Sequence, residues 1–466
     1  MSRDVPTAAL LLGLLCLAVP AAAQERFPPP EFESGHTMPP TRSPAAAAPW
    51  HEIVDLGVLA VALAAASVLA LRVRYRWPIV ALSVFSLLYF GFYRGGCVCP
   101  IGAIQNVAQG LAGGTVLPLV VVLIFVLPLA TALFFGRTFC AAVCPLGAVQ
   151  DLVAVHPLRV PGWLEQSLGL LAWVYLGAAV VFAVTDSAWI ICRYDPFVSI
   201  FRLVPLGKML EGWARRDPGL DPAAVSGRTG MLLLAGGFVA VGLFVARPYC
   251  RYLCPYGALL GLLSKVSRYR VTITPTECVQ CRLCEDACPF GAIRRPTAEA
   301  ADRQRTRGKA PLAVMLALLP ALVVAGGFFG GLLGPTMARL HPTVALADRI
   351  RLENAGEVDG TTEASEAFRA TGRTADDLYA DAGGIESTFT ALWRPGGLGV
   401  GAAHLLGAFV GLVIALKLAG LGLRRRRRDY EADRASCVAC GRCFAHCPIE
   451  RAARKGTEVT ITPAEA

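Results

Sequence analysis

Two cysteine runs, far apart in the chain, constrain its fold more than any other feature. Each has the spacing Cys-x2-Cys-x2-Cys-x3-Cys-Pro, which holds cubane iron–sulfur clusters in bacterial ferredoxins. Structural zinc sites usually pair two Cys-x2-Cys knuckles instead. In two-cluster ferredoxins the fourth cysteine of each run ligates the other cluster. The two predicted 4Fe-4S ligand sets are Cys278, Cys281, Cys284 and Cys447, and Cys437, Cys440, Cys443 and Cys288.

Two short β-branched segments frame these runs. Residues 271–275 lie just before the first run and residues 459–463 just after the second. Alternating β-branched residues are typical of strands, so we expect the two segments to pair and close one α+β ferredoxin module. The module is split, because two long apolar runs and a polar segment lie between its halves.

The composition indicates a membrane protein. The chain has 466 residues, of which only 17% are charged, and its mean hydropathy is +0.53. Such an apolar chain predicts several membrane spans. The net charge of +10 comes from basic residues beside apolar runs, which is typical of cytoplasmic anchoring and not of nucleic-acid binding. Iron–sulfur ligands need a reducing compartment, so we expect the ferredoxin halves to face the cytoplasm.

The apolar runs and their basic flanks predict the domain order. We expect an α-helical polytopic protein of the bacterial inner membrane, with about seven spans after a signal peptide and a split two-cluster bacterial-type ferredoxin module (α+β). An uncleaved first helix is the alternative to the signal peptide. The C-terminus is expected in the cytoplasm and residues 334–395 in the periplasm. The predicted parts are a signal peptide (1–23), a periplasmic linker (24–52), a five-span membrane domain (53–258), the first ferredoxin half (259–310), a transmembrane helix (311–333), a periplasmic domain (334–395), a second transmembrane helix (396–423) and the second ferredoxin half (424–466).

Cysteine clusters in the membrane domain end in a recurring Cys-Pro-x-Gly-Ala unit. Cys140 and Cys144 fall at the inner end of one predicted span, and Cys250 and Cys254 at the inner end of another. Four thiolates converging there would suit a third iron–sulfur centre or zinc. A structural thiol pair or a redox disulfide is the alternative.

Three further cysteines, Cys97, Cys99 and Cys192, fall at the outer ends of their predicted spans. These three thiols are one fewer than the four that usually bind zinc or a 4Fe-4S cluster. A mononuclear metal, a cluster with one ligand that is not cysteine, and a disulfide all remain open. Arg193 and Asp195 flank Cys192, and we expect them to form a local ion pair.

Histidines could clamp a haem or line a quinol pocket. His51, His341 and His404 fall near the outer ends of predicted spans. A lone interfacial histidine is more often a hydrogen-bonding residue, and no Cys-x-x-Cys-His motif for covalent haem is present. We therefore expect no haem.

At these residues the chain resembles the membrane polyferredoxins that include the NosR/NirI proteins and the NapH-type quinol dehydrogenase subunits. The resemblance is carried by Cys140/Cys144/Pro145, by Cys250/Cys254/Pro255 and by the two ferredoxin runs. It implies electron delivery toward a periplasmic reductase. NosR-like members carry a periplasmic FMN domain before the spans, but segment 24–52 is too short for one, so we expect no FMN.

The resemblance and the motifs together predict a membrane-bound iron–sulfur electron-transfer protein. It would move electrons between the cytoplasmic side or the quinol pool and a periplasmic reductase system of the respiratory nitrogen-oxide type. The expected partners are membrane lipid, quinol and a periplasmic or membrane redox protein, with no nucleic acid. A quinol dehydrogenase subunit is one alternative. A regulator or maturation factor for a periplasmic metalloenzyme is another.

Overall fold

The structure is a computed structural model. The predicted signal peptide, Cys97 and segment 459–463 lie outside the residues that it describes, as does most of the predicted linker. The described residues are 49–96, 98–113, 117–155, 157–158, 160–195, 197, 200–201, 222–273, 278–297, 309–357, 363–392, 400–422, 427 and 429–455.

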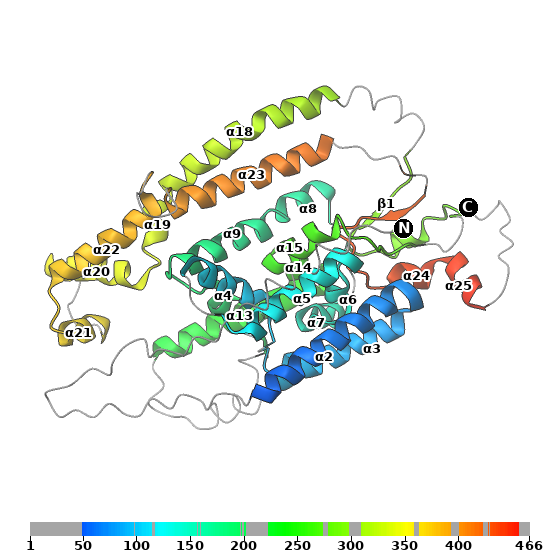
Figure 1. Ribbon diagram of the computed structural model, residues 1–466, viewed down its shortest axis with the longest axis horizontal. Helices are drawn as coiled ribbons and strands as arrows, with labels where there is room; N and C mark the ends of the chain where they lie inside the picture. Colours follow the sequence, from blue (N-terminus) through cyan, green and yellow to red (C-terminus); the bar gives the residue numbers. More distant parts are fainter. Residues whose placement is uncertain are drawn as a thin grey trace. The chain divides into compact units, whose positions relative to one another are not determined.

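The first described element is a helical hairpin. Helix α2 (Pro49–Val68) continues as a π-helical turn η1 (Leu69–Val73), and α3 (Arg76–Ser86) continues as η2 (Leu87–Tyr93). The two helices lie side by side in Figure 1. Arg74 makes the turn between them in a left-handed conformation (φ 54°), which costs energy in a residue that is not glycine. Its side-chain contacts, described below, offset that cost.

Three helices of the membrane domain begin at the proline of a Cys-Pro pair, as α25 (Pro448–Lys455) does in the ferredoxin. They are α4 (Pro100–Gly113), α7 (Pro145–Val153) and α15 (Pro255–Ser264). Proline is favoured at a helix start because the amide hydrogen it lacks would have no intrahelical partner there. Each cysteine before the proline therefore lies at a helix N-terminus. In the membrane domain the repeated Cys-Pro-x-Gly-Ala pentapeptide thus forms a cysteine–helix unit.

The rest of the membrane domain surrounds these units. Apolar helix α5 (Leu119–Phe135) leads to the short α6 (Thr138–Ala142), and α13 (Pro222–Phe244) leads to the short α14 (Pro248–Tyr252). Helix α9 contacts α4 and α15, and one buried core includes Leu176 of α9, Ile104 of α4 and Leu260 of α15. The connecting helices are α8 (Gly162–Leu168), α9 (Leu171–Val184) and α10 (Ile190–Tyr194).

A second helical hairpin separates the ferredoxin halves. Helices α18 (Lys309–Leu332) and α23 (Ala402–Gly422) pack along each other, as Figure 1 shows. Glycines let the backbones touch: a Cβ on Gly407 would collide with the carbonyl oxygen of Gly326. Small residues at such contacts are typical of helix pairs in membranes.

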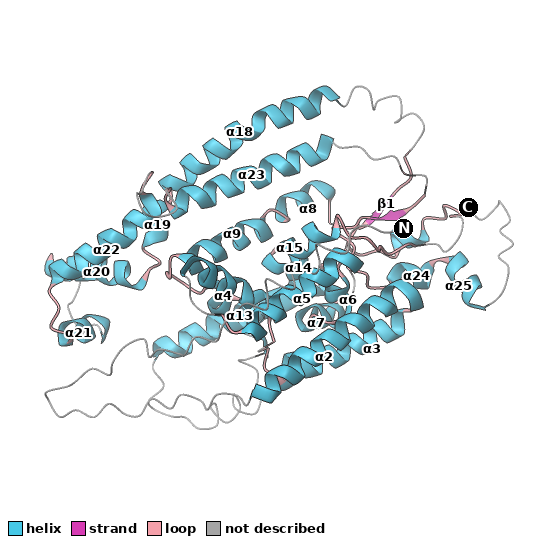
Figure 2. Ribbon diagram, in the orientation of Figure 1, coloured by secondary structure: helices cyan, strands magenta, loops and turns pink. Residues whose placement is uncertain are grey.

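Between α18 and α23 lies a small helical domain. Its elements are α19 (Gly334–Ala338), α20 (Pro342–Asn354), α21 (Glu363–Ala370) and α22 (Ala375–Thr390), all helical in Figure 2. Its core contains Ile350 and Leu378. Thr374 and Asp377 form a capping box at the start of α22. We continue to assign this domain to the periplasm as a prediction.

The ferredoxin halves meet through a sheet of two very short strands. Strand β1 (Ile293–Arg294) pairs antiparallel with β2 (Glu431–Ala432), with Ile293 opposite Ala432. The strand prediction for 271–275 is wrong in its described part, since residues 271–273 are irregular. The reason is that Arg74 takes the Ile273 carbonyl as a hydrogen-bond acceptor. The remaining helices of the module are α16 (Leu283–Asp286), α24 (Arg442–His446) and α25 (Pro448–Lys455).

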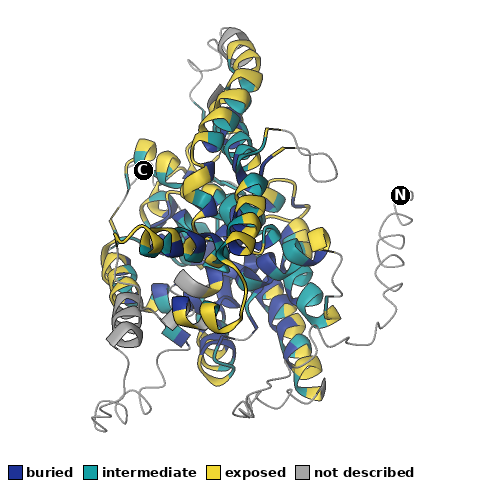
Figure 3. Ribbon diagram, turned by 90° about the vertical axis from the view of Figure 1, so that its left-hand side faces the viewer, coloured by how far each residue is buried: buried dark blue, intermediate teal, exposed yellow. Residues whose placement is uncertain are grey.

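Five helical segments are long and apolar enough to cross a membrane. Two more of the seven predicted spans correspond to shorter apolar segments, Leu119–Phe135 and Leu233–Phe244. Apolar side chains face outward along α18, where Val324 is 72% exposed, and exposed residues line the outside of the helices in Figure 3. The five segments are Trp50–Val73, Arg76–Tyr93, Gly162–Val184, Ala313–Leu332 and Ala402–Gly420.

Candidate metal centres

The structure brings the first predicted ferredoxin set together from both runs. The thiol of Cys284 lies within electrostatic range of Cys278, Cys281 and Cys447. Burial and these neighbouring thiols raise the pKa of Cys284 to about 12. Cys447 comes from the second run, so the crossed arrangement expected of two-cluster ferredoxins has a counterpart in space.

The second predicted set also gathers across the two runs. Cys443 is buried within electrostatic range of Cys437, Cys440 and Cys288, and burial followed by these thiols raises its pKa well above the usual value. A cavity of about 20 Å³ is lined by all four cysteines. In the described part of the chain, no three His, Cys, Asp or Glu side chains converge as the ligands of one ion would.

The four membrane-domain cysteines form a buried group, here called the inner tetrad: Cys140, Cys144, Cys250 and Cys254. The thiols of Cys144 and Cys250 lie close enough to interact with each other. Cys140 and Cys254 lie within electrostatic range of Cys250. The structure therefore joins the two Cys-x3-Cys-Pro motifs, as the sequence predicts. A thiol pair in contact also keeps the redox-disulfide alternative open.

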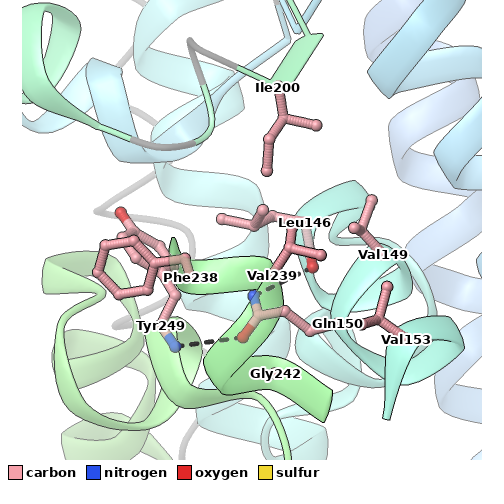
Figure 4. A pocket seen from close by; sticks show the side chains of 9 residues that line it. All are labelled: Leu146, Val149, Gln150, Val153, Ile200, Phe238, Val239, Gly242 and Tyr249. Carbon is pink, nitrogen blue, oxygen red and sulfur yellow. Dashed lines mark hydrogen bonds between the residues drawn. The ribbon is translucent and has the colours of Figure 1, made fainter. Parts of the chain in front are cut away.

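Nitrogen donors surround the inner tetrad. Gln150 Nε2 lies 3.4 Å from Cys250 Sγ, and the backbone N–H of Gly257 donates to Cys254 Sγ at 3.2 Å. Gln150 also accepts from the Tyr249 backbone N–H at 3.2 Å; Figure 4 shows this bond beside a cavity of about 10 Å³. Hydrogen bonds to cysteine sulfur tune iron–sulfur potentials and orient the ligands.

Two arginines reach from one Cys-x3-Cys-Pro motif of the inner tetrad to the other. Arg137 and Arg247 each stand three residues before the first cysteine of their motif. The guanidinium of Arg247 donates to the carbonyl of Cys140 and to Asp151 at 2.6 Å. Its Nη1 would lie 3.4 Å from a Cβ on Gly147. That glycine makes room for the arginine of the other motif.

The second arginine repeats this arrangement. Arg137 Nη2 lies 3.8 Å from Cys140 Sγ and would lie 3.3 Å from a Cβ on Gly257. Sequence reasoning missed both arginines. The available signal was their equal spacing from Cys140 and Cys250.

The arginines also reach the ferredoxin. Arg137 Nη1 donates to the carbonyl of Ala435 at 2.9 Å, two residues before Cys437. Arg247 lies over the ring of Phe290, 5.9 Å from its centroid, two residues after Cys288. The second ferredoxin set therefore lies against the inner tetrad.

Arg74 of the first hairpin contacts both halves of the ferredoxin. It donates to Glu450 at 3.1 Å and to the Ile273 carbonyl at 2.9 Å, and it lies 4.9 Å from the Phe444 ring centroid. Glu450 and Ile273 belong to different halves. One residue of the first hairpin thus clamps both halves against the membrane domain.

A second cysteine site lies apart from the inner tetrad. Cys99, Cys192 and Asp195 line a cavity of about 160 Å³, the outer cavity. Cys97 and the side chain of Arg193 lie outside the described structure. Asp195 is fully buried and accepts hydrogen bonds from the Phe197 N–H at 2.8 Å and from the Tyr249 hydroxyl. The ion pair that we expect between Asp195 and Arg193 stays a prediction, because the Arg193 side chain lies outside the described residues.

Two of the histidines have structural contacts. The ring nitrogens of His404 lie 3.0 Å from the Gly327 carbonyl and 3.2 Å from the Thr390 carbonyl. His341 Nδ1 accepts from Thr343 at the start of α20. Both rings hold helix ends in place.

Two family domains match the chain, and both are described as 4Fe-4S binding domains. One covers residues 117–169 and 228–273, and the other covers residues 271–294. The first contains the inner tetrad and the second contains the first ferredoxin run. The chain is therefore an iron–sulfur protein by two independent domain matches.

Among curated proteins, protein NirI of Paracoccus denitrificans is 31% identical over 223 residues, 47% of this chain and 24% of NirI. An uncharacterized protein of Methanocaldococcus jannaschii is 37% identical over 71 residues, 15% of this chain and 29% of that protein. YccM of Escherichia coli, whose name assigns it to electron transport, is 27% identical over 130 residues, 28% of this chain and 33% of YccM. The chain thus spans a third or less of the length of each. No solved structure matches.

Proposed function

We propose, from the premise that this chain is a NosR/NirI-like membrane 4Fe-4S protein, that it moves electrons between the cytoplasmic side or the quinol pool and a periplasmic reductase system. The reductase would belong to respiratory nitrogen-oxide metabolism, the class that the resemblance indicates. When bound, each iron–sulfur cluster supplies one-electron redox chemistry. The chain supplies ligands, charge and position.

The proposal assigns the cysteines to centres. Two 4Fe-4S clusters are held by the crossed ferredoxin sets, and a third centre by the inner tetrad. The cavity lined by Cys288, Cys437, Cys440 and Cys443 and the nitrogen donors at the tetrad support this assignment. Soft thiolates with N–H donors are the donor set that such clusters need.

The observation that carries the proposal is the pair of arginines between the ferredoxin and the tetrad. Arg137 contacts both Cys140 and Ala435, and Arg247 contacts both Cys140 and Phe290. A docked contact of this kind gives electrons a defined order. They pass between the Cys278 set, the Cys437 set and the inner tetrad, in that sequence or its reverse.

The same arginines fit a redox centre electrostatically. A cluster held by thiolates is an anion and becomes more negative when it is reduced. Buried positive charge beside it favours the reduced state, because Coulomb interactions are strong where water is excluded. Arg247 is 1% exposed. We therefore propose that the arginines raise the reduction potential of the tetrad centre.

Basic flanks support the proposed sidedness. Arg72, Arg74 and Arg76 follow or begin the first two membrane helices, and such residues usually mark the cytoplasmic face. Since Arg74 binds the ferredoxin, the module would share that face. A reporter fused after Ala466 should be active in the cytoplasm of a bacterial cell. Periplasmic activity would overturn this orientation.

Electron transfer across liposomes tests the function. Full-length protein is purified anaerobically and reconstituted into liposomes that contain ferricyanide, and dithionite is added outside. Wild-type protein should reduce the trapped ferricyanide well above the rate of empty liposomes. Cys440→Ser and Cys250→Ser should lower it to that rate, while the exposed-site control Arg373→Ala should match wild type.

Two further outcomes decide the proposal. A wild-type rate equal to that of empty liposomes, both with and without a quinone in the bilayer, would overturn electron transfer and favour the regulator or maturation reading. A rate that rises only when quinone is present would place the quinol pool in the path and support the quinol side of the proposal.

A further inference from the structure

The outer cavity is built on the same local frame as the inner tetrad. In the tetrad, Gln150 stands six residues after Cys144 and accepts from the backbone N–H of Tyr249, the residue before Cys250, at 3.2 Å. In the outer cavity, Gln105 stands six residues after Cys99 and accepts from the backbone N–H of Ile191, the residue before Cys192, at 3.1 Å. Both glutamines are buried. In each site, therefore, a buried glutamine six residues after one cysteine binds the backbone just before a second cysteine.

The Cys-Pro corner is repeated as well. The sulfur of Cys254 accepts the backbone N–H of Gly257, and the backbone N–H of Gly102, in the same relative position, lies within interaction range of the Cys99 sulfur. The glycine again permits a close approach, since a Cβ on Gly102 would lie 3.8 Å from Cys192 Sγ. Cys99 and Cys192 thus face one another across a helix N-terminus, as the two motifs of the tetrad do.

Asp195 lies close to the place of a ligand cysteine, although it stands three residues after Cys192 whereas Cys254 stands four residues after Cys250. It precedes a proline, as Cys254 does, and its backbone N–H donates back to Ile191 as that of Cys254 donates to Tyr249. Its carboxylate accepts a backbone N–H two residues later, as the Cys254 sulfur accepts one three residues later. Asp195 also lies within electrostatic range of Cys99. A carboxylate stands where the frame elsewhere puts a thiolate.

The cavity can hold a group of this kind. Its volume of about 160 Å³ is roughly ten times what one water needs. Its residues also lie outside both matched 4Fe-4S binding domains, apart from Val121 and Ile124 of α5.

We propose that Cys99, Cys192 and Asp195 bind a fourth centre, an iron–sulfur cluster with one carboxylate ligand. Thiolates select iron–sulfur clusters, whereas a carboxylate is a harder ligand. These three side chains supply three of the four ligands that a 4Fe-4S cluster takes, so one iron stays open to an external ligand. This site goes beyond the proposed electron path, which needs only the ferredoxin and the tetrad.

Two tyrosines place the new site next to the tetrad. The Tyr249 hydroxyl donates to Asp195, and the same residue's backbone bonds to Gln150, which donates to Cys250. Tyr256 lies within electrostatic range of Cys140, Cys254 and Cys99. The fourth centre and the tetrad therefore share buried side chains.

Metal analysis with EPR tests the proposal. Full-length protein is purified anaerobically as wild type, Cys99→Ser, Cys192→Ser, Asp195→Asn and Asp195→Cys, with Asp186→Asn as the control. Asp186 is an exposed carboxylate close by in the sequence that bonds Gln109. Iron, acid-labile sulfide and EPR spectra are measured for each. Circular dichroism and the ferredoxin EPR signals report whether each variant is folded.

The two cysteine variants should each lose about four irons with the ferredoxin signals unchanged. Asp195→Asn should lower the iron content, and Asp195→Cys should restore it with an altered spectrum. Asp186→Asn should equal wild type. Folded Cys99→Ser and Cys192→Ser that retain the wild-type iron and spectrum would overturn the site. So would mass spectrometry of native protein that finds either cysteine in a disulfide. Absence of the ferredoxin EPR signals from the wild-type protein would overturn the proposed function. The iron content of the Cys99 and Cys192 variants would still test the fourth centre separately.

Discussion

The inner tetrad and the outer cavity share a frame but differ in what faces the centre. Both have a Cys-Pro corner, a glycine that allows close approach and a buried glutamine that fixes the opposite segment. The tetrad has four thiols with Arg137 and Arg247 beside them. The outer cavity has a carboxylate that a tyrosine hydroxyl bonds. The backbone frame therefore does not dictate ligand type or charge.

This difference separates two roles. The tetrad is enclosed, positively flanked and in contact with the ferredoxin, which suits passage of electrons. The outer cavity has a volume of about 160 Å³ and a harder ligand, which suits contact with an external molecule. The following predictions test the separation, from the largest expected effect to the smallest.

The largest effect should come from removing one thiol of each site. Cys250→Ser should abolish electron transfer in liposomes and empty the tetrad, because the thiolate is a ligand and a contact of Cys144. Cys99→Ser should empty the outer cavity and leave the tetrad signal intact. EPR of reduced protein measures both. If either variant removes both signals, the two sites are one centre and the comparison fails.

The next effect concerns buried arginines. Arg247→Gln should destabilise the protein by about 3 kcal/mol, because it leaves a carboxylate without its buried partner. Arg94 holds the corresponding place before Cys97 and pairs with Asp55 at 2.6 Å, but its side chain is 24% exposed. Arg94→Gln should therefore cost less, about 1–2 kcal/mol. Thermal unfolding in detergent compares the two variants.

A redox titration gives the Arg247 variant a second readout. Loss of the buried positive charge should lower the reduction potential of the tetrad centre, while Arg94→Gln should leave it unchanged. If Arg247→Gln and Arg94→Gln lose equal stability and neither changes the reduction potential of the tetrad centre, Arg247 has a structural role alone.

The matched glutamines come third. Gln150→Leu should weaken retention of the tetrad centre by about 10- to 100-fold, and Gln105→Leu should do the same only for the outer cavity, since residues behind the ligands have effects of this size. Iron release to a chelator, followed over time, measures each. A Gln105→Leu protein that releases iron like wild type would show that the repeated frame carries no centre there.

The smallest effect on the redox centres should come from Arg74. Arg74→Ala removes its bonds to Glu450 and Ile273 and should loosen the ferredoxin by about 1–3 kcal/mol, the range for bonds to charged groups. Hydrogen exchange should increase in the module. The EPR signals of the tetrad and of the outer cavity should not change. No increase in exchange would show that other contacts hold the module.

The sequence predicts the parts of these sites that depend on local spacing. The crossed sets that pair Cys284 with Cys447 and Cys443 with Cys288 have counterparts in space, because the ferredoxin spacing itself implies the exchange. The closeness of Cys144 and Cys250 could be foreseen because both follow span ends that the sequence assigns to the same face. These relations follow from the spacing of the cysteines along the sequence.

Relations across the fold were out of reach. The exchange of Arg137 and Arg247 between motifs depends on how α6 and α14 face each other. Segment 271–273 has a strand-like composition, but Arg74 takes its carbonyl group, so local propensity gave the wrong prediction. Asp195 could have been found as the residue before Pro196 in a frame that elsewhere reads Cys-Pro.

The most direct test of the account is iron and acid-labile sulfide analysis, with EPR, of full-length protein purified without oxygen. Two ferredoxin clusters, the tetrad and the outer centre predict about sixteen irons per chain, with an equal amount of sulfide. The dithionite-reduced protein should show signals from more than the two ferredoxin clusters. Colourless protein without iron, or about eight irons with ferredoxin signals alone, would contradict the claim that the paired cysteine motifs in the membrane domain hold redox centres.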